Sequence, residues 1–525
     1  MISVVDAQNL SKVVEKQFGV DQFQLDEINC WPLVKFIFYG ILAQERKRKY
    51  NQFARKGSHS NPIEVLSGNS IRRFKRSTKR TNFGSLSIYS PKGHTLSVEY
   101  DFLFIELYVD YRRQHGNKLI DQYLDPLLWV AKKNYSAIKL CHLEYSCSQK
   151  EFYYPPHFYI NSQIPHLQMR GDKSDFFSTL QELKAFVIAK DSRFDFDIIT
   201  EFKRIVSVFE KAKALIPFLS HVNPKAIFLQ SFPNSEKASW LVAGKNVSIP
   251  VVDLQHGYLD SHQVFSSYSS RISPAASQIS FPDCIGAWGQ ETKSALSLGH
   301  PQPALGQVEI CGYLWPAMKE QLGMPPPSCE PAPSTAPKRV LIIHQPDLFI
   351  QYSGSGGQLP EFLFNAIKKS GNTVNWVFRL HPRSRHLADD YLRFFKKSGI
   401  NNLSIEQPTD ISIEYSISKA ETVLTSWSTV AFEANQLGKK VGIIDEVGKQ
   451  VFGKYILAGC FAYTSNEKEL SRLLEIPDSP PKIPYFSPNP KETALAFLER
   501  FAPPSVKLIQ TQKGIFNRLF FNRLT

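Results

Sequence analysis

The most informative pattern in the sequence is a run of apolar residues that stops at a polar cluster, and it occurs three times. Residues 251–257 read VVDLQHG, residues 377–383 read VFRLHPR, and residues 423–434 read VLTSWSTVAFEA. Buried parallel strands are near-continuous apolar runs, and in open α/β sheets the functional groups follow their carboxyl ends. The three runs therefore predict polar side chains gathered at the ends of parallel strands.

Apolar and polar segments alternate regularly in the last third of the chain. The pattern predicts strands at 339–344, 373–380, 403–406, 422–425 and 440–444. Helical patterns follow them at 361–369, 387–397, 411–419 and 429–437, then near 448–457 and at 467–474. Strands that alternate with helices at this spacing predict a doubly wound parallel sheet of about five strands.

The preceding part shows the same alternation less regularly. A strand at 226–229, a helix at 236–245 and a strand at 249–254 form a predicted βαβ unit, so these strands should be parallel. Further strands are expected at 101–110 and near 287–289 and 308–312, and helices at 176–189, 197–214 and 291–298. The predicted fold class is α/β, with two Rossmann-like domains facing a cleft and a mixed α/β extension at the amino terminus.

A proline-rich segment marks the expected domain boundary. Residues 322–337 read LGMPPPSCEPAPSTAP and contain six prolines, a composition typical of extended linkers. We therefore expect an amino-terminal domain over 1–321, a carboxyl-terminal domain over 338–480, and a terminal helix and tail over 481–525.

The positive charge is concentrated in one segment. Residues 46–80 hold twelve Lys or Arg against the single acid Glu64, which gives +11 of the net charge of +14 and leaves +3 elsewhere. Such a segment is either a solvated basic loop or a surface for an anionic partner. No nucleic-acid-binding motif accompanies it, so we expect no nucleic acid partner. The tail at 513–524, KGIFNRLFFNRL, is basic and amphipathic, and either lies on an anionic membrane or packs on the protein.

The remaining composition excludes several classes of protein. The seven cysteines include no CxxC pair, which argues against a disulfide framework or a zinc site and favours a reducing compartment. No secretory signal pattern is present, and the apolar stretch at 31–43 is too short to span a bilayer.

The third run predicts an anion-binding turn. Ser426, Ser428 and Thr429 stand between a strand and a helix, where hydroxyls, free backbone N–H groups and the helix dipole favour a phosphate. Glu433 follows one turn later and can accept hydrogen bonds from a ribose diol. The alternative is an ordinary helix start with a glutamate facing solvent.

The second run predicts charged and polar ligands for the same nucleotide. Pro382 cannot continue a strand, so His381 should stand at the strand end and contact a phosphate or a base carbonyl. Arg379 and Arg383 are suited to phosphate charge, and the alternative is a structural His-Pro turn. Gln345 closes the preceding strand and should line the same donor pocket.

A glycine-rich segment at 353–357, SGSGG, lacks both the P-loop lysine and a full GxGxxG pattern. It predicts only a loop, and no phosphate site is assigned to it.

The first run predicts a histidine at the tip of a strand. Gly257 lets the backbone turn sharply after His256, and a histidine there suits a general base or a phosphate ligand. A structural histidine is the alternative. Four further residues belong to the same expected cleft: Asp253 and Asp260 as alternative bases, and Gln255 and His262 as its lining.

These runs, in this order, resemble bacterial GT-B glycosyltransferases of surface-polysaccharide assembly, over roughly residues 220–475. Gln255-His256-Gly257 is similar to the Trp-His-Gly of CDP-glycerol glycerophosphotransferases, and His381-Pro382 to the His-Pro motif of sialyl- and Kdo-type transferases. The segment 426–433 resembles a paired-serine motif with its ribose-binding glutamate, although Trp427 separates the serines and Gln255 replaces the tryptophan.

The resemblance implies an inverting, metal-independent transferase with a GT-B-like fold and no cofactor. Its donor is a nucleotide sugar linked to CMP or another nucleotide, and its acceptor is a glycan or lipid-linked glycan. His256 or Asp260 is the base. The implied location is cytoplasmic, peripheral at the inner face of the membrane. The alternatives are a nucleotide-sugar 2-epimerase, a polyol-phosphate transferase, or a non-catalytic scaffold of a polysaccharide assembly complex.

Overall fold

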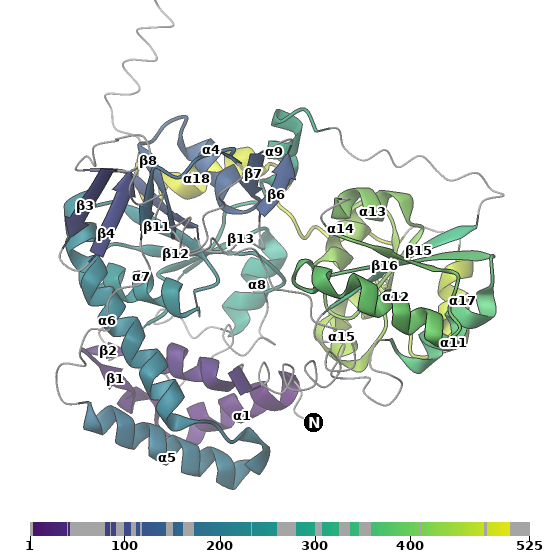
Figure 1. Cartoon of the computed structure of the whole chain (residues 1–525), viewed down its shortest axis with the longest axis horizontal. Coiled ribbons are helices and arrows are strands. Elements are labelled where there is room, and N and C mark those ends of the chain that lie inside the picture. The colour runs from purple at the N-terminus through teal and green to yellow at the C-terminus, as the bar shows by residue number, and fades with distance from the viewer. Residues whose placement is uncertain are drawn as a thin grey trace, which may run out of the picture.

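The structure is a computed structural model, and it shows two sheet-centred domains side by side (Figure 1). The residues that it describes are 4–38, 40–41, 79–83, 86–90, 99–106, 112–115, 118–142, 151–160, 173–232, 234–259, 280–299, 307–324, 337–345, 359–408, 412–476 and 480–503.

The amino-terminal domain is built on a nine-stranded sheet. In spatial order its strands are β14 (Gln307–Ile310), β13 (Cys284–Ala287), β12 (Val251–Leu254), β11 (Ala226–Gln230), β5 (Phe102–Glu106), β8 (Ala137–His142), β10 (Phe158–Ile160), β4 (Leu86–Ser90) and β3 (Lys79–Phe83). The strands from β14 to β10 are parallel to one another. β4 pairs antiparallel with both β10 and β3. The order reverses between β5 and β11, as in a Rossmann fold.

Both faces of this sheet are covered, which explains the continuous apolar runs. Phe102, Phe104 and Phe228 face α4 (Leu124–Ala131) and α18 (Pro490–Glu499), whereas alternate residues such as Leu103 face the opposite side. That side is covered by α6 (Ile198–Val222) and α7 (Ser235–Asn246).

The amino-terminal extension packs on the α6 side of this domain (Figure 1). It comprises α1 (Val4–Gln17), the hairpin of β1 (Gln24–Leu25) and β2 (Ile28–Asn29), a helical segment at 31–38 and α5 (Ser174–Lys190). Lys35 is fully buried within the short apolar stretch noted above, and its Nζ lies 2.7 Å from Glu15 Oε1. No helix in the described ranges is long and apolar enough to cross a membrane.

Smaller elements complete this domain at the carboxyl ends of its strands. They are the three-stranded sheet of β6 (Arg112–His115), β7 (Lys118–Asp121) and β9 (Glu151–Phe152), with α8 (Gln290–Gly299) and α9 (Trp315–Gln321).

The carboxyl-terminal domain is a six-stranded sheet in which every pairing is parallel. Its strands in spatial order are β17 (Leu403–Glu406), β16 (Val374–Arg379), β15 (Lys338–Ile343), β18 (Thr422–Thr425), β19 (Lys440–Ile443) and β20 (Ala462–Tyr463). Its helices are α11 (Glu361–Ser370), α12 (Ala388–Lys397), α13 (Ile413–Lys419), α14 (Val430–Gln436), α15 (Glu446–Val451), α16 (Gly453–Leu457) and α17 (Glu467–Glu475). The order reverses between β15 and β18, so the predicted fold class of two Rossmann-like domains is confirmed.

After α17 the chain returns to the amino-terminal domain, where α18 packs on the central sheet. The returning segment packs closely against two glycines, Gly289 after β13 and Gly312 after β14. A Cβ on Gly289 would lie 2.3 Å from the backbone oxygen of Tyr485, and Gly312, with a φ of +78°, lies against Pro490. Larger residues at these glycines would push the segment away.

Several sequence predictions fall outside the described residues. These are most of the basic segment (46–78), the centre of the proline-rich linker (325–336), the glycine-rich loop at 353–357, the tail from 504, and Asp260 and His262.

Candidate functional site

Gln345 joins the two central strand ends of the carboxyl-terminal domain. Its Oε1 accepts hydrogen bonds from Trp427 N (3.0 Å), Ser426 N (3.2 Å) and Thr425 Oγ1 (3.4 Å). This contact bridges β15 and β18 where the strand order reverses, the usual place for a ligand in such sheets. The structure thus brings Gln345 to the serine turn.

The two serines of this turn have different surroundings. Ser426 is buried and its hydroxyl donates to Asp445, whose carboxylate also caps α15 by accepting from Gly448 N. The Ser428 hydroxyl accepts from Val430 N at 3.3 Å, at the start of α14, and Thr429 directly precedes that helix. Ser428 and Thr429 are therefore closer to the open side of the turn than Ser426.

The His-Pro turn is held by a second, buried histidine. His344 Nδ1 accepts from His381 N at 3.4 Å, and its Nε2 lies 2.8 Å from Tyr391 Oη. Burial, reinforced by the nearby charge of His381, lowers the pKa of His344 to about 3, so its ring is neutral. His344 thus fixes the backbone at His381. His381 itself is half-buried and directly precedes Pro382.

Arg379 is the last residue of β16, and its side chain is buried next to the edge strand β17. Its buried guanidinium donates to Glu406 and, at 2.7 Å, to Ser416 Oγ. These contacts tie β16 to β17 and α13, so any phosphate contact by Arg379 would be in addition to a structural role. The structure does not describe the side chain of Arg383.

Glu433 faces the other domain. In the described ranges no residue hydrogen-bonds to its carboxyl group. Burial, followed by the charge of Glu414, raises the pKa of Glu433 to about 8, while Lys319, Arg113 and Arg379 act in the opposite direction. Arg113 on β6 and Lys319 on α9 belong to the amino-terminal domain, so charges from both domains act on this carboxyl group.

Two tyrosines of the amino-terminal domain lie near the same carboxyl group. Burial raises the pKa of both Tyr123 and Tyr313, and the charge of Glu433 raises each further, whereas Arg113 lowers it. Both phenols are therefore neutral at pH 7. Glu433 therefore interacts electrostatically with the tyrosines and Arg113 across the boundary between the domains.

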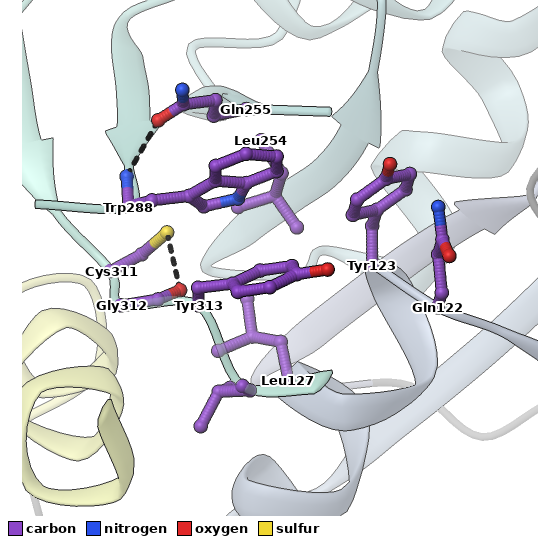
Figure 2. Close-up of a pocket in the computed structure, with 10 residues that line it drawn as sticks. Gln122, Tyr123, Leu127, Leu254, Gln255, Trp288, Cys311, Gly312 and Tyr313 are labelled. Carbon is purple, nitrogen blue, oxygen red and sulfur yellow. Dashed lines mark hydrogen bonds between the residues drawn. The ribbon is translucent and has the colours of Figure 1, made fainter. Parts of the chain in front are cut away.

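Figure 2 shows the pocket that contains these tyrosines, at the carboxyl ends of β12, β13 and β14. Trp288 lies between them: its ring centroid is 4.6 Å from that of Tyr313 and 5.9 Å from that of Tyr123. The amides of Gln122 and Gln255 supply polar lining. The cavity volume is about 20 Å³, which is room for about one water molecule.

Gln255 holds the turn that carries His256. Its Oε1 accepts from Trp288 N at 2.7 Å, and its Nε2 donates to Gly257 O at 2.9 Å and to Tyr485 Oη at 3.0 Å. Tyr485 in turn stacks on Phe432 with 3.8 Å between ring centroids. The half-buried His256 therefore stands on a turn connected to α14, which carries Glu433.

Asp253 points away from this pocket. Because side chains alternate along a strand, Leu254 lines the pocket while Asp253 faces α7 and the ammonium of Lys237. Burial raises the pKa of Asp253, and Lys237 opposes that shift. This placement leaves His256 as the only one of the three proposed bases that the described residues place at the strand tip.

The sequence did not reveal the contribution of the other domain to the Glu433 site. Tyr313 directly follows Gly312, a predicted strand end, but Arg113 and Tyr123 come from segments in which no strand-end pattern was recognised. Lys319 and Trp315 on α9 bind Glu414 on α13 at 2.9 and 3.1 Å, which is visible only in three dimensions. No group of three or more metal-ligating side chains occurs in the described part of the chain.

Strand ends of two Rossmann-like sheets thus meet around one group of acidic, basic and aromatic side chains. No family model and no curated protein matches the chain. It is similar to solved structures of UDP-GlcNAc 2-epimerases from Methanocaldococcus jannaschii (13% identity, 76% of this chain and 99% of that one, TM-score 0.42) and Neisseria meningitidis, the latter bound to UDP-GlcNAc (14%, 76% and 99%, 0.42). A third is the HepE protein of Anabaena in complex with UDP and glucose (12%, 80% and 100%, 0.36). Similarity at this level supports no statement about the activity of this chain.

Proposed function

We propose that the protein is a glycosyltransferase that uses a nucleotide sugar bound between its two domains. The observation that carries the proposal is the position of Glu433. Its carboxyl group, without a hydrogen bond in the described ranges, lies on the carboxyl-terminal domain and interacts electrostatically with Tyr123, Tyr313 and Arg113 of the amino-terminal domain. A ligand at Glu433 would therefore touch both domains.

In this proposal the nucleotide lies at the carboxyl ends of β15, β16 and β18. Glu433 accepts hydrogen bonds from the ribose, and His381 with the turn at Ser428 and Thr429 contacts the phosphates. Gln345 shapes this turn through its bonds to Ser426 N and Trp427 N.

His256 is the proposed general base. It removes the proton of the acceptor hydroxyl as that oxygen bonds to the sugar and the bond to the leaving phosphate breaks. Gln255 keeps the turn in place through the Gly257 carbonyl. The main catalytic contribution expected from the carboxyl-terminal domain is stabilisation of the leaving phosphate by fixed hydrogen-bond donors.

The acceptor is proposed to be a glycan, carried on a lipid. The support is compositional: the basic segment at 46–80 and the basic amphipathic tail suit an anionic membrane surface. Binding of the purified protein to vesicles with and without anionic lipid tests this part separately.

A thermal-shift screen tests nucleotide binding. CMP, CDP, UDP, GDP and their sugar conjugates are added to the pure protein, and a ligand that binds only the folded state raises its melting temperature. We expect one nucleotide class to give a clear shift that Glu433→Ala or His381→Ala abolishes. Glu361→Ala, at an exposed carboxylate at the start of α11, is the matched control and should keep the shift. If no nucleotide shifts the well-folded protein, the proposal is wrong.

A nucleotide-sugar 2-epimerase is the second candidate, and it rests on a different observation. The pKa values of two carboxyl groups at the domain boundary are shifted in opposite directions from their ordinary values. The pKa of Glu433 is raised, whereas for Glu414 the effect of burial is outweighed by Lys319 and the pKa lies below its usual range. Neighbouring carboxyls shifted apart suit acid and base roles on one substrate. Conversion of the free nucleotide sugar without any acceptor would favour this candidate over the transferase.

A further inference from the structure

Tyr258, two residues after His256, extends from the amino-terminal domain into an aromatic socket of the other domain. Its ring stacks on Phe432 with 5.6 Å between centroids and meets Phe452 edge-on at 5.0 Å. Tyr485 of the returning segment closes the side, 6.4 Å away. These three rings, which we call the aromatic socket, are fully buried in the core of the carboxyl-terminal domain.

The next residue holds the same turn to its own domain. Leu259 is buried and belongs to the core cluster of the amino-terminal domain. Before the turn, Gln255 accepts a hydrogen bond from Trp288 N at 2.7 Å. Among the described residues, no atom lies within 4 Å of a Cβ built on Gly257. The turn is therefore held by the side chains on either side of it and not by packing at its tip.

The socket connects the turn to the helix that carries the proposed ribose ligand. Phe432 directly precedes Glu433 on α14. The contact between the Phe432 and Tyr258 rings therefore joins this helix to the turn of His256. A second attachment comes from Tyr258 Oη, which donates to Val451 O at the end of α15 at 3.5 Å.

The ring is the main part of this attachment. A hydrogen bond at 3.5 Å is long and contributes little. Aromatic pairs, in contrast, stabilise beyond the area that they bury, and aromatic side chains in buried pockets carry much of the energy of contacts between protein surfaces. Loss of the Tyr258 ring should therefore release the turn, whereas loss of its hydroxyl should not.

Other elements keep the domains together independently of this ring. Lys454 on α16 lies 2.6 Å from Glu291 on α8, and Lys319 on α9 lies 2.9 Å from Glu414 on α13. These ion pairs contain no residue of the turn. Removal of the ring is therefore expected to act on the turn locally.

We propose that Tyr258 is a positioning residue whose ring, seated in the aromatic socket, holds the His256 turn against α14. The turn and Glu433 are then kept in one fixed arrangement. The catalytic consequence rests on the proposed function, because it takes His256 as the base and Glu433 as the ribose ligand. The attachment of the turn requires no ligand and is tested separately.

Carbethoxylation of His256 by diethyl pyrocarbonate, followed by peptide mass spectrometry, measures how often the turn leaves the socket. Tyr258→Leu keeps apolar bulk but removes the ring, so the rate at His256 should rise about 3- to 10-fold, as for the loss of one aromatic contact. Tyr258→Phe keeps the ring and should stay within about 2-fold of wild type. His221, exposed on α6, is the internal reference and should react equally in every protein.

Two further variants show whether the effect belongs to the socket. Phe452→Leu removes a wall of the socket from the other domain. It should also raise the rate at His256, and it keeps the test available if Tyr258→Leu does not fold. Glu291→Ala is the control, because it removes the partner of Lys454 across the domains but leaves the ring contacts of Tyr258 in place. Its rate should stay within about 2-fold of wild type.

Turnover and donor binding should respond differently to Tyr258→Leu. The substrates are UDP-glucose, GDP-mannose, CDP-glucose and CMP-sialic acid, with water as the acceptor and release of free nucleotide as the signal. The water oxygen bonds to the sugar as the bond to the phosphate breaks, and His256 takes the proton.

For the substrate that the wild type converts, Tyr258→Leu should lower kcat about 10- to 100-fold, because the base is misplaced. KM should change less than about 2-fold, because the proposed nucleotide contacts lie on the other domain. Tyr258→Phe should restore kcat. General loosening of the protein would instead weaken donor binding as well.

The possible results separate this proposal from the proposed function. An unchanged rate at His256 in both Tyr258→Leu and Phe452→Leu overturns the attachment of the turn. An equal rise in Glu291→Ala also overturns it, because loosened domains would then explain the effect. If the rate rises as expected but the wild type converts no nucleotide sugar, the proposed function fails and the catalytic role of Tyr258 fails with it, while the attachment of the turn stands.

Discussion

Both domains close their strand ends with a glutamine, but they do so differently. In the carboxyl-terminal domain Gln345 Oε1 accepts from Ser426 N and Trp427 N, which belong to the same sheet. In the amino-terminal domain Gln255 Oε1 accepts from Trp288 N, while its Nε2 also reaches Tyr485 on the segment returning from the other domain. The strand ends of the carboxyl-terminal domain are therefore held together within that domain, whereas the turn of His256 depends on the chain that returns from the other domain.

A buried ion network within the amino-terminal domain gives the largest expected effect. Lys139 lies at 0% exposure, 2.8 Å from Glu106 Oε2 and 2.5 Å from Asp125 Oδ1. In Lys139→Met two buried carboxylates lose their cation, so the free energy of unfolding should fall by about 3–5 kcal/mol.

Denaturant unfolding of Lys139→Met measures this change. Lys225→Met is the matched control, because its partner Asp101 is also on the amino-terminal domain but Lys225 is 51% exposed. That control should stay within about 1 kcal/mol of wild type. Similar losses in both variants would contradict the role given to the buried network.

The two glutamines allow a direct comparison. Gln255→Leu loses three hydrogen bonds, including one to the returning segment, and should lower the free energy of unfolding by about 2–4 kcal/mol. Gln345→Leu also loses three hydrogen bonds, but all of them lie within one turn of a single domain, so it should cost about 1–2 kcal/mol. Unfolding curves of the two variants check the order, and a larger loss for Gln345→Leu would contradict the account.

The raised pKa of Glu433 predicts a pH-dependent stability. The folded state holds the proton up to about pH 8, whereas the ordinary value is 4.5, so this group destabilises the fold as the pH rises between these values. Glu433→Gln removes that loss and should stabilise the protein at pH 9 by on the order of 2 kcal/mol, with little change at pH 4.

Melting temperatures of wild type and Glu433→Gln across this pH range provide the measurement. Glu414, Lys319, Arg113, Arg379, Tyr123 and Tyr313 surround the group and are unchanged in the variant. A constant difference between the two proteins at every pH would show that Glu433 does not titrate as described.

The smallest expected effect concerns the link between the domains. Tyr485→Phe removes the hydrogen bond to Gln255 but keeps the stack on Phe432, and should cost about 1 kcal/mol of stability. Tyr455→Phe loses a comparable bond across the domains, to Glu291 at 3.1 Å, without touching the turn of His256. If the proposed function holds, only Tyr485→Phe should lower kcat while leaving KM for the donor nearly unchanged.

The carboxyl-terminal fold could be predicted closely because its strands are buried on both faces. The predicted strands at 403–406 and 422–425 coincide with β17 and β18, and the others differ by a residue or two at their ends. The amino-terminal sheet was predicted only in part. β8 reads AIKLCH, and its central lysine breaks the apolar run because the compensating Glu106 and Asp125 are distant in sequence.

The residues of the candidate site also fall into two sets, those on the carboxyl-terminal domain that could be predicted and those on the amino-terminal domain that could not. The strand-end runs predicted Gln345, His381, Ser428 and Glu433 as one group, because a strand and its polar end are local features. Arg113, Tyr123 and Lys319 reach Glu433 only when the domains pack together, so no local pattern signals them. The return of α18 to the first domain has no local signal either.

The most direct test of the account is a crystal structure of the protein with the nucleotide sugar that gives the largest thermal shift. The account predicts the ribose at Glu433 and the phosphates near His381 and the Ser428 turn. A nucleotide bound away from Glu433 would contradict it.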